Sequence, residues 1–215
     1  MNFRKWRYPA FICAGLLMFF TISSHADPKQ IGAVVKMFGT GTAGIVSEKS
    51  LKGIESTGID VSGLTCFELP GLDPVSGRKL AVVVDCIRPI NTDGDLKGEG
   101  LQVEAYNFFF FHNGTVVNHD CNSVRPFFEG TGDAGVTHMT GSIPPSEFNK
   151  ATGVNGPEAC TVNQGIIYGA GAYKNVVGDA RLSGAVNLSK FSEGTITFSC
   201  LYVLNLALKK EGIVD

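Results

Sequence analysis

The sequence predicts an all-β protein: an antiparallel up-and-down β-barrel of about eight strands, with a β-sandwich as the alternative. Glycine is abundant, at 27 of 215 residues. The apolar segments are short, rich in Val, Ile, Phe and Tyr, and separated by Gly, Pro, Asn and Asp, which is the pattern of strands joined by turns. The run Phe108–Phe111 places two rings on each face of its strand. A barrel wall can be covered on both faces, by the lumen inside and by a helix or long segment outside.

The first 26 residues are predicted to be a cleaved secretory signal. Arg4, Lys5 and Arg7 form a basic start, residues 10–22 are apolar without charge, and small residues at positions 24 and 26 suit a cleavage site. The apolar run is shorter than the roughly 20 residues of a membrane-spanning helix. We therefore expect a secreted or periplasmic protein with no stable membrane anchor, whose residues 27–215 form a single β-barrel domain.

Ten segments are predicted as strands, and one turn predicts the register of the two strands that it joins. The Asn113-Gly114 pair is typical of a type I′ turn, because both central positions need positive φ. With these two residues as the loop, Phe111 faces Val116 and Phe108 faces His119. The predicted strands are Gly32–Phe38, Leu64–Leu69, Lys79–Pro89, Leu101–Phe111, Thr115–Cys121, Val124–Glu129, Gly135–Ser142, Gly165–Tyr173, Asp179–Leu188 and Thr195–Leu208.

Cysteine usage agrees with export, since oxidising compartments favour disulfides. A hairpin centred on Ser76 puts Cys66 directly across from Cys86, within disulfide range, and predicts that bridge. Cys121 and Cys160 are the second candidate pair. Cys200, in an apolar strand, is then left as a buried free thiol, although sequence alone leaves other pairings open.

Charge and motifs exclude several functions. After signal removal, 15 Lys and Arg stand against 20 Asp and Glu, and there is no basic run, so nucleic acid is not an expected partner. His112, His119 and His138 lack zinc-ligand spacing, and Lys97 spoils the calcium-loop pattern of residues 93–104, so no metal is expected. The glycine-rich segment 169–174 completes neither nucleotide-binding motif, so no cofactor is predicted.

One hairpin carries a family resemblance. Gly169-x-Gly171-x-Tyr173, then Gly178-x-Ala180-Arg181-Leu182 and the apolar last strand from Ile196, resemble the C-terminal part of allene oxide cyclase and dirigent barrels over residues 165–206. The resemblance implies an eight-stranded antiparallel barrel whose lumen can hold a hydrophobic molecule, and a homo-oligomer, a trimer by analogy. No working residue of those families matches a position in this chain, so their chemistry is a fold-level analogy.

Three functions are compatible with such a barrel. The first is the binding of a small hydrophobic molecule in the lumen, in a mainly apolar pocket with a few polar groups. The second is a cyclase or isomerase acting on a hydrophobic substrate that is lipid-derived or phenolic, and the third is a non-catalytic surface or host-interaction protein with a filled lumen. The pocket candidates are Tyr106, Phe108, Phe110, Tyr168 and Tyr173, and the catalytic candidates, which would stabilise charge, are Arg181, Glu104 and His138.

Overall fold

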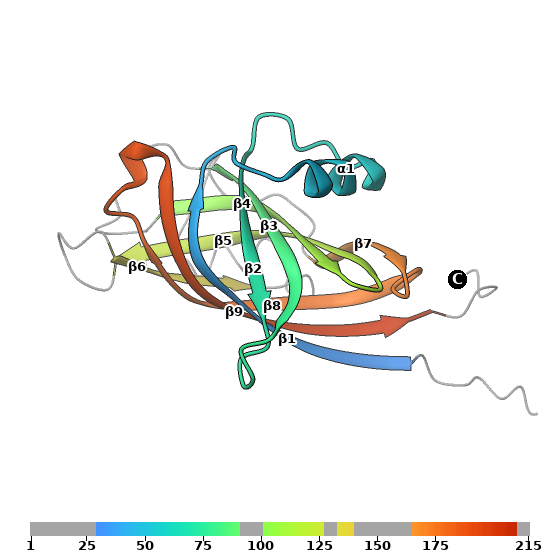
Figure 1. Cartoon of the computed structure of the whole chain (residues 1–215). Coiled ribbons are helices and arrows are strands. Elements are labelled where there is room, and N and C mark those ends of the chain that lie inside the picture. Colours follow the sequence, from blue (N-terminus) through green and yellow to red (C-terminus); the bar gives the residue numbers. More distant parts are fainter. Residues whose placement is uncertain (1–28, 91–100, 127–132, 140–164, 210–215) are drawn as a thin grey trace, which may run out of the picture.

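A computed structural model describes residues 29–90, 101–126, 133–139 and 165–209 and shows an antiparallel barrel (Figure 1). The predicted fold class is therefore confirmed. The predicted signal peptide lies outside the described residues. The elements of the described part are β1 Lys29–Thr42, α1 Glu48–Thr57, β2 Thr65–Leu72, β3 Lys79–Pro89, β4 Leu101–Phe111, β5 Gly114–Pro126, β6 Asp133–Met139, β7 Gly165–Gly171, β8 Val176–Asn187, the 3-10 turn η2 Phe191–Glu193 and β9 Thr195–Leu208.

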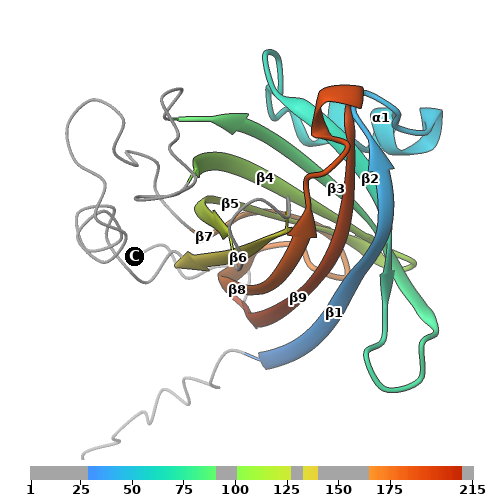
Figure 2. The same cartoon turned by 90° about the vertical axis from the view of Figure 1, so that its left-hand side faces the viewer.

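The sheet closes on itself as a ring of eight. The strands follow the order β4-β3-β2-β1-β9-β8-β6-β5, and β5 also pairs with β4. Figure 2 looks toward one end of this ring. The strands β6 and β7 pair with different parts of the same strand, β5. β6 pairs with residues 121–126 of β5, and β7 pairs with residues 114–119. Closure reduces the number of exposed strand edges, which would otherwise promote aggregation, although among the described strands β7 pairs with β5 alone.

The predicted strands agree closely with the structure. The bounds of β3, β4 and β9 are as predicted, and the two predicted segments on either side of residues 122–123 form the single strand β5. The helix α1 was not predicted, because its apolar signal is weak: its buried residues are only Ser50 and Ile54. Capping defines the helix instead, since Ser47 accepts a hydrogen bond from the Ser50 backbone N–H and Gly58 ends the helix with φ 70°.

The predicted register between β4 and β5 is wrong by two residues. Phe111 pairs with Gly114, so the loop is His112-Asn113. A Cβ on Gly114 would lie 2.2 Å from the carbonyl oxygen of Ala170, and the Asn113 carbonyl accepts a hydrogen bond from the Ala172 N–H at 2.9 Å. Glycine is therefore required here for close approach to another hairpin rather than for positive φ. A shift of two residues keeps every side chain on its predicted face.

Two separate cores pack on the two faces of this wall, as the sequence pattern required. Phe109 and Phe111 belong to the interior core. Phe108 packs outside with Ile54 of α1, Val84 and Val117. Gly53 lets the helix approach closely, since a Cβ there would lie 2.6 Å from the Phe110 ring. The unpredicted helix is thus the outer cover of the aromatic strand.

Candidate functional site

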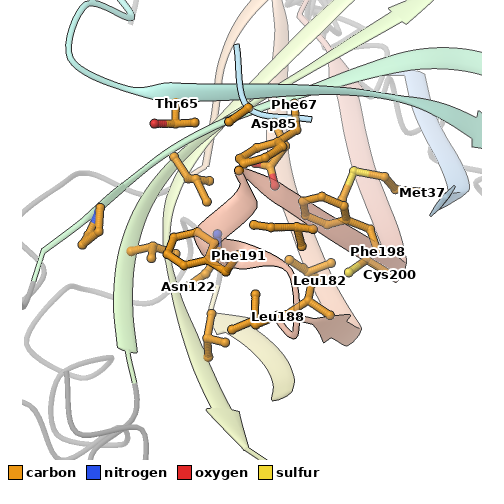
Figure 3. A pocket seen from close by; sticks show the side chains of 18 residues that line it. Met37, Thr65, Phe67, Asp85, Asn122, Leu182, Leu188, Phe191, Phe198 and Cys200 are labelled. Atoms are coloured by element: carbon orange, nitrogen blue, oxygen red, sulfur yellow. The ribbon is translucent and has the colours of Figure 1, made fainter. Parts of the chain in front are cut away.

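The barrel interior is filled in one half and hollow in the other. Near the turn between β4 and β5, the interior is packed by large side chains, with Phe111 against Tyr173 at 5.2 Å between ring centroids and Phe109 edge-on to Tyr202 at 5.0 Å. The opposite half contains a cavity of about 350 Å³ (Figure 3). Its described lining is formed by Met37, Ala43, Thr65, Phe67, Asp85, Ile87, Pro89, Val103, Asn122, Val124, Leu182, Val186, Leu188, Phe191, Gly194, Ile196, Phe198 and Cys200.

The lining follows from strand alternation, which turns every second residue inward. Leu182 and Val186 face the cavity from β8, and Ile196, Phe198 and Cys200 face it from β9. At the mouth, η2 carries Phe191, whose exposed fraction of 53% shows that it stands partly in solvent. The volume lies at the lower end of the range for small-molecule pockets, about 300–1,000 Å³. The shape and lining suit a small, largely apolar guest.

A layer of buried polar side chains crosses the barrel at the inner end of the cavity. Its members are contributed by β3, β4, β5 and β9, and each is 6% exposed or less: Asp85, Asn107, Asn118, Asp120, Asn122 and Tyr202. Asp85 and Asn122 also line the cavity. The layer therefore separates the filled half of the barrel from the hollow half and gives the hollow half a polar floor.

Hydrogen bonds connect this polar layer. The Asn107 amide donates to Asp85 Oδ1 at 2.8 Å and to the Tyr202 hydroxyl at 3.1 Å. The Asn118 amide donates to Asn107 Oδ1 at 3.0 Å and to Asp120 Oδ2. Buried polar groups are costly unless hydrogen-bonded, so the network explains how a barrel interior tolerates two carboxyl groups.

Burial raises the pKa of both carboxyl groups. Desolvation, followed by the negative charge of Asp120, raises the pKa of Asp85 to about 7. Desolvation also raises the pKa of Asp120 to about 7, against the hydrogen bonds from Asn118 and Asn122 and the charge of His119 on the outer face, which lower it. Among the described residues, no Lys, Arg or His side chain lines the cavity. The cavity thus presents a carboxyl group that changes its protonation near neutral pH, without a basic neighbour.

The cysteines agree with prediction where the structure describes them. Cys66 and Cys86 pair across β2 and β3 and form a disulfide with 2.07 Å between the sulfur atoms. Cys200 is a buried free thiol, as predicted, and burial followed by the charge of Asp85 raises its pKa to about 12. Cys121 is disulfide-bonded. Its predicted partner Cys160 lies outside the described residues, so that pairing stays a prediction.

None of the five predicted pocket residues lines this cavity. Tyr106, Phe108, Phe110 and Tyr168 belong to the cluster under α1, on the outer face of the wall. Tyr173 does pack against the interior core, but in the filled half, beside Phe111. The sequence pattern placed aromatic residues on both faces of β4 but did not show which face was the lumen. The rings of this strand that point inward are those of Phe109 and Phe111.

The predicted catalytic residues do not come together. Arg181 is exposed and alternates with the buried Ala180 and Leu182, so it points away from the lumen, and a role for it inside the barrel fails. Glu104 is 6% exposed but lies on the outer face, where Arg88 Nε donates to it at 2.5 Å and His119 Nε2 lies 2.9 Å away. His138 is on β6, paired with Asn122 in the backbone register.

On the outer face, Glu104 forms a cluster with Arg88, His119 and Tyr106, whose polar and ring contacts are made to one another. His119 stacks on Tyr106 with 3.9 Å between ring centroids, and Arg88 covers the carboxylate from the solvent side with 56% of its side chain exposed. Within the part of the chain that the structure describes, no group of three metal-ligating side chains gathers. The calcium-like loop lies largely outside the described residues.

Sequence reasoning missed the polar layer, although a signal for it existed. Asn118, Asp120 and Asn122 recur at every second position of one strand, which places all three on one face. Asp85 directly follows the apolar run of residues 80–84, and Asn107 directly precedes the apolar run of residues 108–111. Polar residues at period two normally indicate a solvent-facing side. Only closure of the sheet shows that this face is the interior.

Comparison with family models, with curated proteins and with solved structures finds no match to this chain. No described helix has the length and apolar character needed to span a membrane. The fold and the cavity are therefore the features of this protein that bear on its function.

Proposed function

We propose that this protein is a secreted or periplasmic barrel that binds a small hydrophobic molecule in its lumen. The observation that carries the proposal is the cavity of about 350 Å³, lined mainly by apolar side chains from at least five strands. Burial of a guest's apolar surface there would stabilise the complex by about 25 cal/mol per Å². The Cys66–Cys86 disulfide supports an oxidising compartment.

A cyclase or isomerase is the second candidate, and Asp85 favours it. This carboxyl lines the cavity, and its pKa is raised to about 7 by burial and by the charge of Asp120. A general acid or base works best when its pKa lies near the operating pH. Asp85 would then move a proton on a bound hydrophobic substrate. The sequence had suggested other residues, Arg181, Glu104 and His138, and a different role, the stabilisation of charge.

The resemblance to allene oxide cyclase and dirigent barrels supports both candidates through the shared barrel architecture alone. A barrel filled throughout would favour the third possibility, a non-catalytic surface or host-interaction protein. The cavity weighs against that reading, because large unfilled volumes in a barrel are normally binding sites. Binding in the lumen is therefore the function that the geometry supports best.

The binding proposal is tested with a reporter and a blocking variant. The chain has one tryptophan, Trp6, which the predicted cleavage removes, so Phe191→Trp at the cavity mouth would provide a single fluorescent reporter. Val186→Phe would fill part of the cavity. We expect small aromatic and aliphatic compounds to change the fluorescence of the Phe191→Trp protein in a saturable manner. Adding Val186→Phe should weaken that response at least tenfold.

The enzyme alternative requires a different readout. A compound that binds is incubated with the protein and with the Asp85→Asn variant, recovered, and compared by chromatography with untreated compound. An isomerised product formed by the natural protein and absent with the variant would support catalysis. The absence of saturable binding by any compound of a broad panel would overturn both candidates.

A further inference from the structure

We propose that the polar end of the molecule held in the cavity is a protonated amine, bound by the Asp85 carboxylate at the inner end of the cavity. This inference deepens the proposed function and rests on it. The chemical class it names is a small apolar amine with one cationic end. The sequence-level expectation of a hydrophobic guest did not specify a polar group.

The first support is the position of Asp85. Its side chain is 6% exposed and lines the cavity from β3, opposite Phe67 on the neighbouring strand β2. In Figure 3 the Asp85 carboxyl points toward the middle of the ring of lining side chains. Among the described residues it accepts one side-chain hydrogen bond, to Oδ1 from Asn107. A carboxylate has two oxygens and about four acceptor positions, so most of its acceptor capacity is not used by the described side chains.

The second support is the balance of donors and acceptors in the polar layer. Both amide N–H groups of Asn107 are used within the layer, and so are both N–H groups of Asn118. Asn118 Oδ1 is a buried acceptor to which no described residue donates. The amides of Asn107 and Asn118 are therefore fully used as donors, whereas Asn118 Oδ1 and most acceptor positions of Asp85 have no described side-chain donor. Of these acceptors only Asp85 lines the cavity, so a guest that brings N–H donors to Asp85 complements this part of the floor.

The third support is charge. The cavity is lined by one carboxyl and, in the described part of the chain, by no cationic side chain. A guest ending in a carboxylate would meet like charge in a low-dielectric interior, which is strongly unfavourable. An ammonium would compensate the charge that burial otherwise penalises. An alcohol could donate one hydrogen bond but would leave the carboxylate charge uncompensated.

The protonation state of Asp85 predicts how the affinity for an amine depends on pH. The titratable groups facing Asp85 are Asp120 on β5 and Cys200 and Tyr202 on β9, and all are neutral or anionic. Burial and Asp120 raise the pKa of Asp85 to about 7. At pH 5.5 the carboxyl would be mostly protonated, whereas at pH 8.0 it would be mostly ionised. Amine binding should therefore strengthen about thirtyfold between these two pH values.

The test uses four probes of nearly equal size that differ at one end: 2-phenylethylamine, 2-phenylethanol, phenylacetate and ethylbenzene. Their dissociation constants are measured with the full mature chain by isothermal titration calorimetry, at pH 5.5 and pH 8.0. We expect the amine to bind at least about tenfold more tightly than the alcohol at pH 8.0, because charge-assisted hydrogen bonds are the stronger class. Phenylacetate should bind most weakly.

Two isosteric variants make the assignment specific. Asp85→Asn removes the carboxylate inside the barrel and should abolish both the preference for the amine and its pH dependence, while ethylbenzene binding is retained. Glu104→Gln is the matched control, since Glu104 is an equally buried carboxylate on the outer face of the neighbouring strand. It should leave the amine preference intact.

The outcomes separate the two proposals. If the alcohol or phenylacetate binds as tightly as the amine at pH 8.0, the cavity binds small molecules but the amine inference is overturned. An amine preference that survives Asp85→Asn also overturns it. If none of the four probes binds and the Phe191→Trp reporter responds to no other compound, the proposed function itself fails. Should Asp85→Asn fail to fold, the pH profile of amine binding by the natural chain decides the question.

Discussion

Replacing Asp85 by Asn is expected to stabilise the protein at alkaline pH, although it changes an enclosed, hydrogen-bonded residue. Asp85 sits in the barrel interior, where desolvation and the charge of Asp120 raise its pKa from 3.8 to about 7. Ionisation of Asp85 therefore destabilises the folded state. Asn keeps the shape and retains an acceptor oxygen for the Asn107 amide, but it carries no charge.

The magnitude follows from the pKa difference between the folded and unfolded chains. Each tenfold change in proton affinity corresponds to about 1.4 kcal/mol, so a rise from 3.8 to about 7 corresponds to about 4 kcal/mol. Below pH 3.8 the carboxyl is neutral in both states and costs nothing. Between pH 3.8 and about 7 the folded chain retains a proton that the unfolded chain has lost, so this group's contribution to stability falls as pH rises and then levels off.

The assay is urea denaturation of the natural protein and of Asp85→Asn, with disulfides intact, at pH 4.0 and pH 8.5. The difference in unfolding free energy between the two proteins cancels the titration of the groups that do not interact with Asp85. It should shift in favour of the variant by about 4 kcal/mol between the two pH values. Glu104→Gln is the control, because it breaks contacts with Arg88 and His119 and should lower stability at both pH values.

One result would refute this reasoning directly. If Asp85→Asn changes the unfolding free energy by the same amount at pH 4.0 and pH 8.5, the carboxyl is not titrating in a desolvated site. The interior polar layer would then be hydrated or differently arranged, and the pH signature inferred for amine binding would lose its basis.

Three further predictions concern other parts of the barrel. Burial raises the pKa of the Cys200 thiol from 9.0 to about 12. At pH 8 this thiol should therefore react with iodoacetamide about a thousandfold more slowly in the folded protein than in urea, as followed by mass spectrometry. Equal rates in the two states would contradict its burial. The double replacement Cys66→Ala/Cys86→Ala removes a bridge that spans 20 residues and should cost about 3 kcal/mol of unfolding free energy, with an unchanged midpoint of urea denaturation as the contrary result. Ile54→Ala should cost about 2–4 kcal/mol, because Ile54 anchors α1 on the outer core, yet it should leave ligand affinity unaltered, and a loss of affinity would show that the two faces are coupled.

The location of the candidate site could not be obtained from the sequence. Strand alternation correctly put Phe108 and Phe110 on one face and Phe109 and Phe111 on the other. Which face becomes the lumen depends on the direction in which the sheet curls and on where α1 packs. Both depend on contacts between residues far apart in the chain, such as the pairing of β1 with β9.

The sequence by itself determined the strand content, the strand bounds of β3, β4 and β9, and the Cys66–Cys86 bridge, because each depends on local alternation or on a single hairpin. Only the tertiary structure decided the rest. Packing of Gly114 against the Ala170 carbonyl set the β4–β5 register, where turn propensity predicted another. Closure of the sheet turned the polar residues around Asp85 inward. A pattern that normally marks a solvated face therefore forms the floor of the cavity.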